Sequence, residues 1–292
     1  MTMETLITAV TDGQKKQVKR FVEDAVDRAI VEGLLDKDSI QKLIENGDGF
    51  QADIAASIKK HLFPNQFVDE EVESIYGYLS GYKPKEIMEQ VHILRQFFPD
   101  IGFADEKLAE RPLPPNAEGW FAIPRWQSVA KTYNEAVQKV LDLIKQQRKG
   151  NFYNYCEGKI GEQYLRQLER TSRKLEALGK AQKGYDILVV AAQFGLRYRG
   201  CSVRRAREVF MGNEFGLGVF EIGCMILTHP ERLANYDDLR IDCAGSESSF
   251  GGDNSFLRAL LFKFNDGKVE FGASWVDIAN GGYGSASGFL SR

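Results

Sequence analysis

Four residues of the C-terminal half could together form a thiol-based catalytic site. Cys224, His229, Asp242 and Cys243 lie within twenty residues of one another. A cysteine activated by a histidine that an acidic group orients is a nucleophile, and the same residue types bind zinc. The spacing argues against both a catalytic thiol and a zinc site. Cys224 and His229 do not have the i, i+4 spacing that places two side chains on one face of a helix, and no Cys-x-x-Cys accompanies them. We expect buried free cysteines and a histidine that ends a helix.

Glu221 is the one charged residue in an otherwise apolar and glycine-containing stretch, 215–227. A carboxylate buried there has either a raised pKa or a basic partner, and both situations occur at acid/base catalytic sites. Gly216, Gly218 and Gly223 indicate close packing around this segment. We favour an ion pair between Glu221 and a nearby arginine, with acid/base catalysis as the alternative.

Five arginines follow the apolar run 187–195. They are Arg197, Arg199, Arg204, Arg205 and Arg207. An apolar element, a turn and a basic helix capped by Ser202 have the outline of a helix-turn-helix, whose arginines would contact phosphates or guanine edges. The turn is longer than that motif requires. The alternative is a basic surface that packs against the acidic N-terminal part of the same chain.

The glycine-rich stretch 280–289 contains no complete nucleotide-binding or nucleophile motif. Its glycines do not have the spacing of a dinucleotide fingerprint, and its serines lack the flanking glycines of a Gly-x-Ser-x-Gly elbow. We expect a flexible loop or an edge strand in which Tyr283, Ser285 and Ser287 are available to a ligand or a partner.

No other pattern indicates a metal or a cofactor. The acidic residues of 237–242 are clustered in sequence only, and the three histidines are scattered. There is neither a His-Glu-x-x-His sequence nor a phosphate-binding Gly-x-x-x-x-Gly-Lys sequence. We therefore expect no bound metal and no cofactor.

The segment 1–110 is expected to be an acidic all-helical domain, because apolar residues recur every three or four positions and prolines separate the pieces. A proline-rich linker, 111–119, follows it. A basic helical domain, 120–235, is expected beyond the linker. The expected helices are 18–30, 38–44, 50–62, 69–79, 84–97, 128–147 and 161–178.

Strands are expected in a glycine-rich β region, 236–292, packed on the second domain. Residues 260–264 and 269–275 read as strands, and Asp266 and Gly267 between them are typical of a tight hairpin turn. The fold class is therefore expected to be mainly α with a small C-terminal antiparallel β region, an α+β arrangement that begins with a short-helix N-terminal bundle.

The 292 residues carry a formal net charge of −3, which conceals a strong segregation of charge. The net charge is −8 for 1–110, +9 for 139–208 and −5 for 209–292. These segments either neutralise one another or present opposite surfaces to partners. The chain lacks a secretory signal and a membrane-spanning run, and its four cysteines are typical of a reducing compartment, so we expect a cytoplasmic protein without a membrane partner.

The absence of a complete catalytic motif favours a non-enzymatic cytoplasmic binding or assembly protein. Such a protein would associate with a protein partner or with itself through complementary acidic and basic helical surfaces. Two alternatives stay open: a nucleic-acid-binding protein that uses the five arginines, and a hydrolase or transferase that uses Cys224 or Cys243 with His229.

Overall fold

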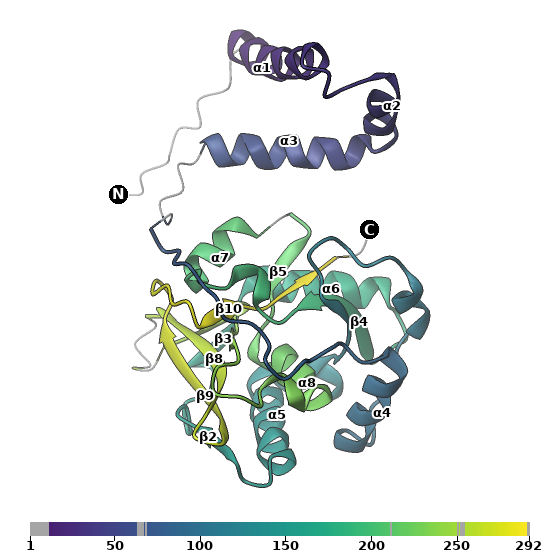
Figure 1. The fold of residues 1–292 in the computed structure, drawn as a ribbon. Helices are drawn as coiled ribbons and strands as arrows, with labels where there is room; N and C mark the ends of the chain where they lie inside the picture. Colours follow the sequence, from purple (N-terminus) through teal and green to yellow (C-terminus); the bar gives the residue numbers. More distant parts are fainter. Residues whose placement is uncertain are drawn as a thin grey trace, which may run out of the picture. The chain divides into compact units, whose positions relative to one another are not determined.

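The structure is a computed structural model that describes residues 12–62, 67, 69–210, 212–249, 251 and 255–290. It divides into two compact units, a helical unit within residues 1–64 and a larger unit formed by residues 65–292. Figure 1 shows the helices of the first unit and the mixed helices and strands of the second. The segment 111–119, where we expected a linker, lies within the larger unit.

Three helices form the helical unit: α1 (Asp12–Val31), α2 (Lys37–Glu45) and α3 (Gly47–Leu62). Gly33 follows α1 with φ +73°, a left-handed conformation that stops the helix. Asp36 caps α2 by accepting a hydrogen bond of 2.8 Å from the backbone N–H of Ser39. The helices expected at 18–30, 38–44 and 50–62 are thus confirmed. None of the described side chains in 12–62 is buried.

The described part of the larger unit contains two sheets. In the four-stranded sheet the order is β1-β4-β11-β5, and neighbouring strands are antiparallel. In the seven-stranded sheet the order is β10-β6-β8-β7-β3, with β9 paired to β8 and β2 paired to β9. The strands are β1 (Gly119–Pro124), β2 (Phe152–Asn154), β3 (Leu165–Gln167), β4 (Ile187–Gln193), β5 (Glu214–Gly216), β6 (Arg240–Asp242), β7 (Ser246–Ser248), β8 (Arg258–Asn265), β9 (Lys268–Trp275), β10 (Tyr283–Ser285) and β11 (Ser287–Phe289).

Helices pack against both sheets. The α-helices of the larger unit are α4 (Ile87–Phe97), α5 (Tyr133–Gln147), α6 (Glu169–Ala181), α7 (Val203–Val209) and α8 (Val219–Thr228). Four short 3-10 helices are η1 (Glu106–Glu110), η2 (Trp126–Ser128), η3 (Leu196–Tyr198) and η4 (Pro230–Arg232).

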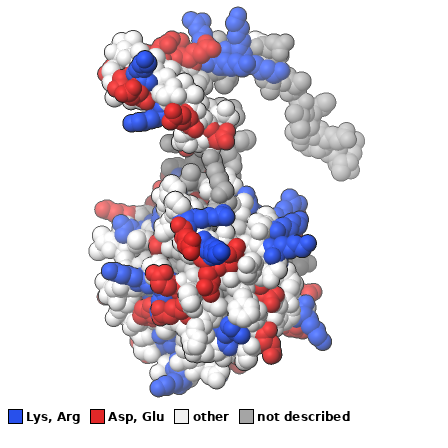
Figure 2. Space-filling view, turned by 90° about the vertical axis from the view of Figure 1, so that its right-hand side faces the viewer, with Lys and Arg blue, Asp and Glu red and all other residues white. Residues whose placement is uncertain are grey.

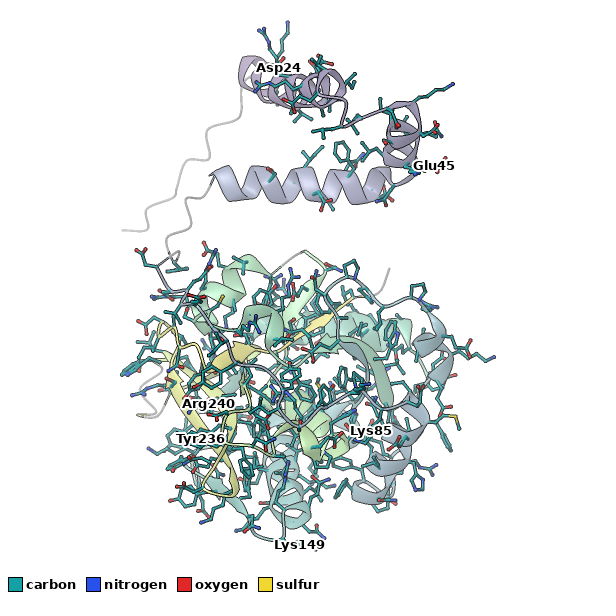
Figure 3. The ribbon with its side chains drawn as sticks, in the orientation of Figure 1. Asp24, Glu45, Lys85, Lys149, Tyr236 and Arg240 are labelled. Atoms are coloured by element: carbon teal, nitrogen blue, oxygen red, sulfur yellow. The ribbon has the colours of Figure 1, made fainter. Side chains whose placement is uncertain are left out.

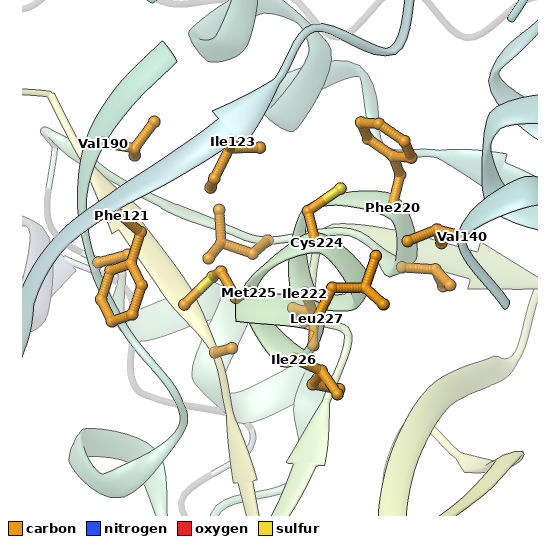
Figure 4. Packing of buried hydrophobic residues seen from close by; sticks show 14 of the residues in the cluster. Phe121, Ile123, Val140, Val190, Phe220, Ile222, Cys224, Met225, Ile226 and Leu227 are labelled. Atoms are coloured by element: carbon orange, nitrogen blue, oxygen red, sulfur yellow. The ribbon is translucent and has the colours of Figure 1, made fainter. Parts of the chain in front are cut away.

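Helix α8 lies at the centre of the core, and all ten of its residues are buried. It packs against α5, β1 and α4. Figure 4 shows Cys224 and Met225 of α8 among Ile123 of β1 and Val140 of α5. A Cβ at Gly223 would lie 2.8 Å from a methyl carbon of Val140, so a glycine permits the close approach of α8 to α5. The residues of α8 are therefore held firmly in place.

The fold class expected from the sequence is wrong. The larger unit is built on two multi-stranded sheets, not on helices with a small β addition at the end. The run 187–195 contains strand β4, whose seven residues are all buried, and a strand buried on both faces has no alternating pattern to reveal it. The expected N-terminal bundle is also incorrect, because α4 packs against α8 and β1 in the larger unit.

The β8–β9 hairpin confirms the one strand pair expected from the sequence. Asp266 has φ +46° and Gly267 has φ +74°, so both turn residues are in the left-handed region that a two-residue hairpin turn requires.

The last strands connect the two sheets, because β10 belongs to the seven-stranded sheet and β11 to the four-stranded sheet with only Ala286 between them. Among the described residues, no helix combines the length and the apolar character needed to cross a bilayer.

Candidate functional site

Each arginine of the cluster has a partner within the same chain. Arg204 forms an ion pair with Glu70, and Arg205 forms one with Glu71. The other three arginines also have partners. Arg207 donates hydrogen bonds to the carbonyls of Ala244 (2.9 Å) and Ser246 (2.8 Å). Arg199 donates to the carbonyl of Tyr76 (3.0 Å), and Arg197 Nε lies 3.6 Å from Oε2 of Glu214. Figure 2 shows basic and acidic side chains intermingled over one face of the larger unit.

The helix-turn-helix outline is wrong, because its first element is strand β4 and its second, α7, is only seven residues long. The alternative was that the basic surface packs against the acidic N-terminal part of the same chain. The ion pairs with Glu70 and Glu71 agree with it, because both residues belong to 1–110.

Cys224, His229 and Asp242 do not form a hydrogen-bonded triad in the described part of the chain. Cys224 is fully buried within α8, and burial raises the pKa of its thiol well above the usual value. His229 Nε2 accepts a hydrogen bond of 2.9 Å from the backbone N–H of Lys85, and its Nδ1 lies 3.2 Å from the carbonyl of Met225. Asp242 lies instead on β6, beside a void of about 50 Å³. His229 is therefore occupied with backbone groups and does not activate a thiol.

All four cysteines are free thiols. Burial raises the pKa of Cys156 to about 12 and that of Cys201 to about 11, and it raises the pKa of Cys243 well above the usual value. A nucleophilic cysteine requires a lowered thiol pKa, so none of these environments favours thiol catalysis.

Ser285 and Ser287 belong to strands β10 and β11 rather than to a flexible loop, and both are fully buried. Ser287 Oγ donates a hydrogen bond of 2.6 Å to Glu214. Tyr283 is partly exposed, with the guanidinium of Arg240 4.7 Å above its ring. The flexible loop is thus wrong, whereas the edge strand that we gave as the other possibility agrees with β10, which lies at the end of the seven-stranded sheet. The two serines are not open to a ligand or partner.

A pocket of about 670 Å³ lies in the larger unit between α6, the segment that follows β1 and the start of α8. This volume is within the usual range for small-molecule sites. Ile123, Trp126 and Leu188 contribute apolar surface to it. Lys180 and Lys183 line the pocket and are exposed, whereas Glu221 lines it and is only 1% exposed. Cations thus lie at the entrance and a carboxyl group lies deep inside.

Glu221 is held by neutral partners. The backbone N–H of Gly218 donates to its Oε2 at 3.0 Å, and Nε2 of Gln167 donates to its Oε1 at 3.0 Å. The hydroxyl of Tyr133 also hydrogen-bonds to this carboxylate and lies 3.2 Å from Oγ of Ser246. No lysine or arginine in the described part of the chain forms an ion pair with Glu221, so the arginine partner that we favoured is wrong.

The local sequence explains how these groups meet. Glu221 is the third residue of α8, from where its side chain reaches back to the N–H of Gly218, as in a capping box. Thr132 caps α5 and so fixes Tyr133 as its first residue. A Cβ at Gly218 would lie 2.5 Å from the Tyr133 hydroxyl oxygen and 2.6 Å from Oε2 of Glu221. A side chain at position 218 would therefore displace the groups that hold the carboxylate.

Burial raises the pKa of Glu221 from 4.5 to about 7, although its hydrogen bonds with Gly218, Gln167 and Tyr133 favour the ionised form. The pKa of Tyr133 is raised well above its usual value by burial, so its hydroxyl stays protonated as a donor. A carboxyl group with a pKa near 7 populates both protonation states at neutral pH. This is the property that a general acid or base needs.

Comparison with known proteins gave no match to a family model, a curated protein or a solved structure. Function is therefore inferred from geometry. In the described part of the chain, no group of three or more His, Cys, Asp or Glu side chains is arranged to hold a metal ion.

Sequence reasoning singled out Glu221 but gave no functional role to Gln167, Tyr133 or Ser246. Gln167 is 54 positions from Glu221 and comes from a three-residue strand. The only local signal was the pair Gly216 and Gly218 just before the carboxylate.

Proposed function

We propose that the protein is an assembly protein that associates with a protein partner, or with a second copy of itself, through its helical unit. The observation that carries this proposal is that none of the described side chains in 12–62 is buried. Val31 is 87% exposed, Leu34 is 69% exposed and Ile44 is 67% exposed. Figure 3 shows the side chains of this unit projecting from its three helices, among them Asp24 and Glu45.

Exposed apolar side chains of this size support association because contact with another surface would remove them from water. Each fully buried Val, Leu or Ile side chain contributes about 1.5–3 kcal/mol. The larger unit, in contrast, has an extensive core of its own. The five arginines give less support to nucleic-acid binding, because their partners are groups of the same chain.

The test compares two matched double variants of the full chain. Val31→Glu/Leu34→Glu changes the helical unit, and Ile75→Glu/Leu79→Glu changes two residues of the larger unit that are 91% and 62% exposed. Sedimentation velocity over a range of protein concentrations, and capture of partners from cell extract, should show association for the wild type and for the second variant only. A chain that stays monomeric and captures nothing, or two variants that associate equally, contradicts the proposal.

We further propose a cytoplasmic location. The four free thiols support it, because unpaired cysteines are usual in a reducing compartment.

A further inference from the structure

We propose that the pocket beside Glu221 binds a small anionic molecule and that Glu221 takes up a proton when this molecule binds. The inference is independent of the assembly proposed above, since the pocket lies wholly within the larger unit.

The cationic groups of the pocket favour an anion. Lys180 and Lys183 are exposed at its entrance. Arg125 lines the same pocket and donates through Nη2 to the carbonyls of Gly179 and Gln182. Its Nε is buried and has no hydrogen-bond partner. The two carbonyls hold the guanidinium in place, and its positive charge at the pocket wall favours an anion.

The apolar part of the lining limits the kind of anion. Ile123 and Leu188 are buried beneath the pocket, and the ring of Trp126 lies beside that of Tyr133, with centroids 6.3 Å apart. A pocket of about 670 Å³ with such walls suits a compact organic carboxylate or phosphate rather than a polymer.

The groups that face Glu221 come from several elements. Tyr133 of α5 and Gln167 of β3 hydrogen-bond to the Glu221 carboxylate. The thiols of Cys224 and Cys243 also lie near it. The charged residues that share the pocket lining are Arg125, Glu176, Lys180 and Lys183. Glu176 is exposed on α6, so a bound anion would be the main new negative charge near Glu221.

The direction of the coupling follows from Coulomb repulsion. A negative ligand disfavours the ionised form of a neighbouring carboxyl group, and this raises the pKa of that group. Because the pKa of Glu221 is already about 7, a further rise makes it take up a proton at neutral pH.

The test uses inorganic phosphate, pyrophosphate and succinate as probes. Isothermal calorimetry at pH 7.5, in two buffers with different ionisation enthalpies, measures both affinity and proton exchange. At least one probe should bind the wild type with net proton uptake and should bind more weakly at higher pH. Lys180→Ala/Lys183→Ala should weaken this binding about tenfold or more. The control Lys145→Ala/Lys268→Ala changes two exposed lysines outside the pocket and should bind as the wild type does.

Glu221→Gln separates the two parts of the proposal. This variant should bind the probe without proton uptake and with an affinity that no longer falls as the pH rises. Binding to none of the probes, or equal binding by the two lysine variants, overturns the anion site. Proton uptake that persists in Glu221→Gln overturns the role of Glu221 while leaving the site.

Discussion

The side-chain amide of Gln167 donates a hydrogen bond of 3.0 Å to Oε1 of Glu221 and so connects strand β3 to the first turn of the central helix α8. This contact joins a surface-accessible strand to a carboxyl group in the core. It also favours the ionised form of Glu221, in opposition to burial.

Replacing Gln167 by Leu should therefore raise the pKa of Glu221 above its wild-type value of about 7, because the carboxylate loses a donor. Carbon-13 NMR titration of the Glu221 carboxyl group measures the shift. Gln127→Leu is the matched control, since Gln127 lines the same pocket but donates no hydrogen bond to Glu221 in the described structure. Equal titration curves for both variants would contradict the assigned role of Gln167.

Glu221 should make the protein less stable at high pH than at low pH. Its pKa is 4.5 in the unfolded chain and about 7 in the folded protein, so the folded protein binds more protons between these values. The free energy of unfolding therefore falls as the pH rises from about 4.5 to about 7. Glu221→Gln should remove about 3 kcal/mol of this pH dependence.

Urea denaturation at pH 4.5, 6 and 8 checks this expectation. Asp242→Asn belongs in the same series, because burial also raises the pKa of Asp242 from 3.8 to about 7. If Glu221→Gln shows the same pH profile as the wild type, Glu221 does not titrate near neutrality.

His229 should have the opposite effect. Burial, followed by the charge of Lys85, lowers its pKa from 6.5 to about 4. The unfolded chain then binds more protons between these values, so the free energy of unfolding falls as the pH drops from 6.5 to 4. Protonation of Nε2 would also break its hydrogen bond with the N–H of Lys85. NMR titration should find the His229 ring neutral at pH 6, and a midpoint above pH 6 would refute this assignment.

Gly218→Ala should disturb the Glu221 site directly. The added methyl would lie 2.5 Å from the Tyr133 hydroxyl oxygen and 2.8 Å from Oγ of Ser246. Overpacking of this kind costs about 1–3 kcal/mol. Gly161→Ala is the control, because nothing lies within 4 Å of a Cβ at that position, and it should change the stability by less than about 0.5 kcal/mol. Thermal unfolding of both variants distinguishes crowding at the site from a general effect of alanine.

Periodicity predicted the elements in which apolar and polar residues recur at a regular spacing. The helices of the helical unit and the β8–β9 hairpin were found in this way, because their apolar and polar residues alternate at a regular spacing. The run that contains β4 could have been a helix or a strand, because a strand that is buried throughout has no alternating pattern. The helix expected at 69–79 is wrong, since Glu71 and Gly77 form isolated bridges with Cys201 and Asp238. Such long-range pairing leaves no local pattern.

Of the residues in the candidate site, only the central one, Glu221, was predicted from the sequence. Glu221 stood out because a lone charge in an apolar stretch must be explained. Its partners Gln167, Tyr133 and Ser246 come from β3, α5 and β7, and no spacing in the sequence relates these elements. The arginines were recognised as a cluster, but their carboxylate partners Glu70 and Glu71 are more than a hundred residues away.

The position of β11 has a consequence for biosynthesis. In the described part of the four-stranded sheet, β11 lies between β4 and β5, and β5 pairs with no other strand. A ribosome completes β4 and β5 long before it reaches residues 287–289, so until then the nascent chain carries one unpaired edge on β4 and two on β5. Such edges invite aggregation. The four-stranded sheet therefore cannot be completed until translation has passed Phe289.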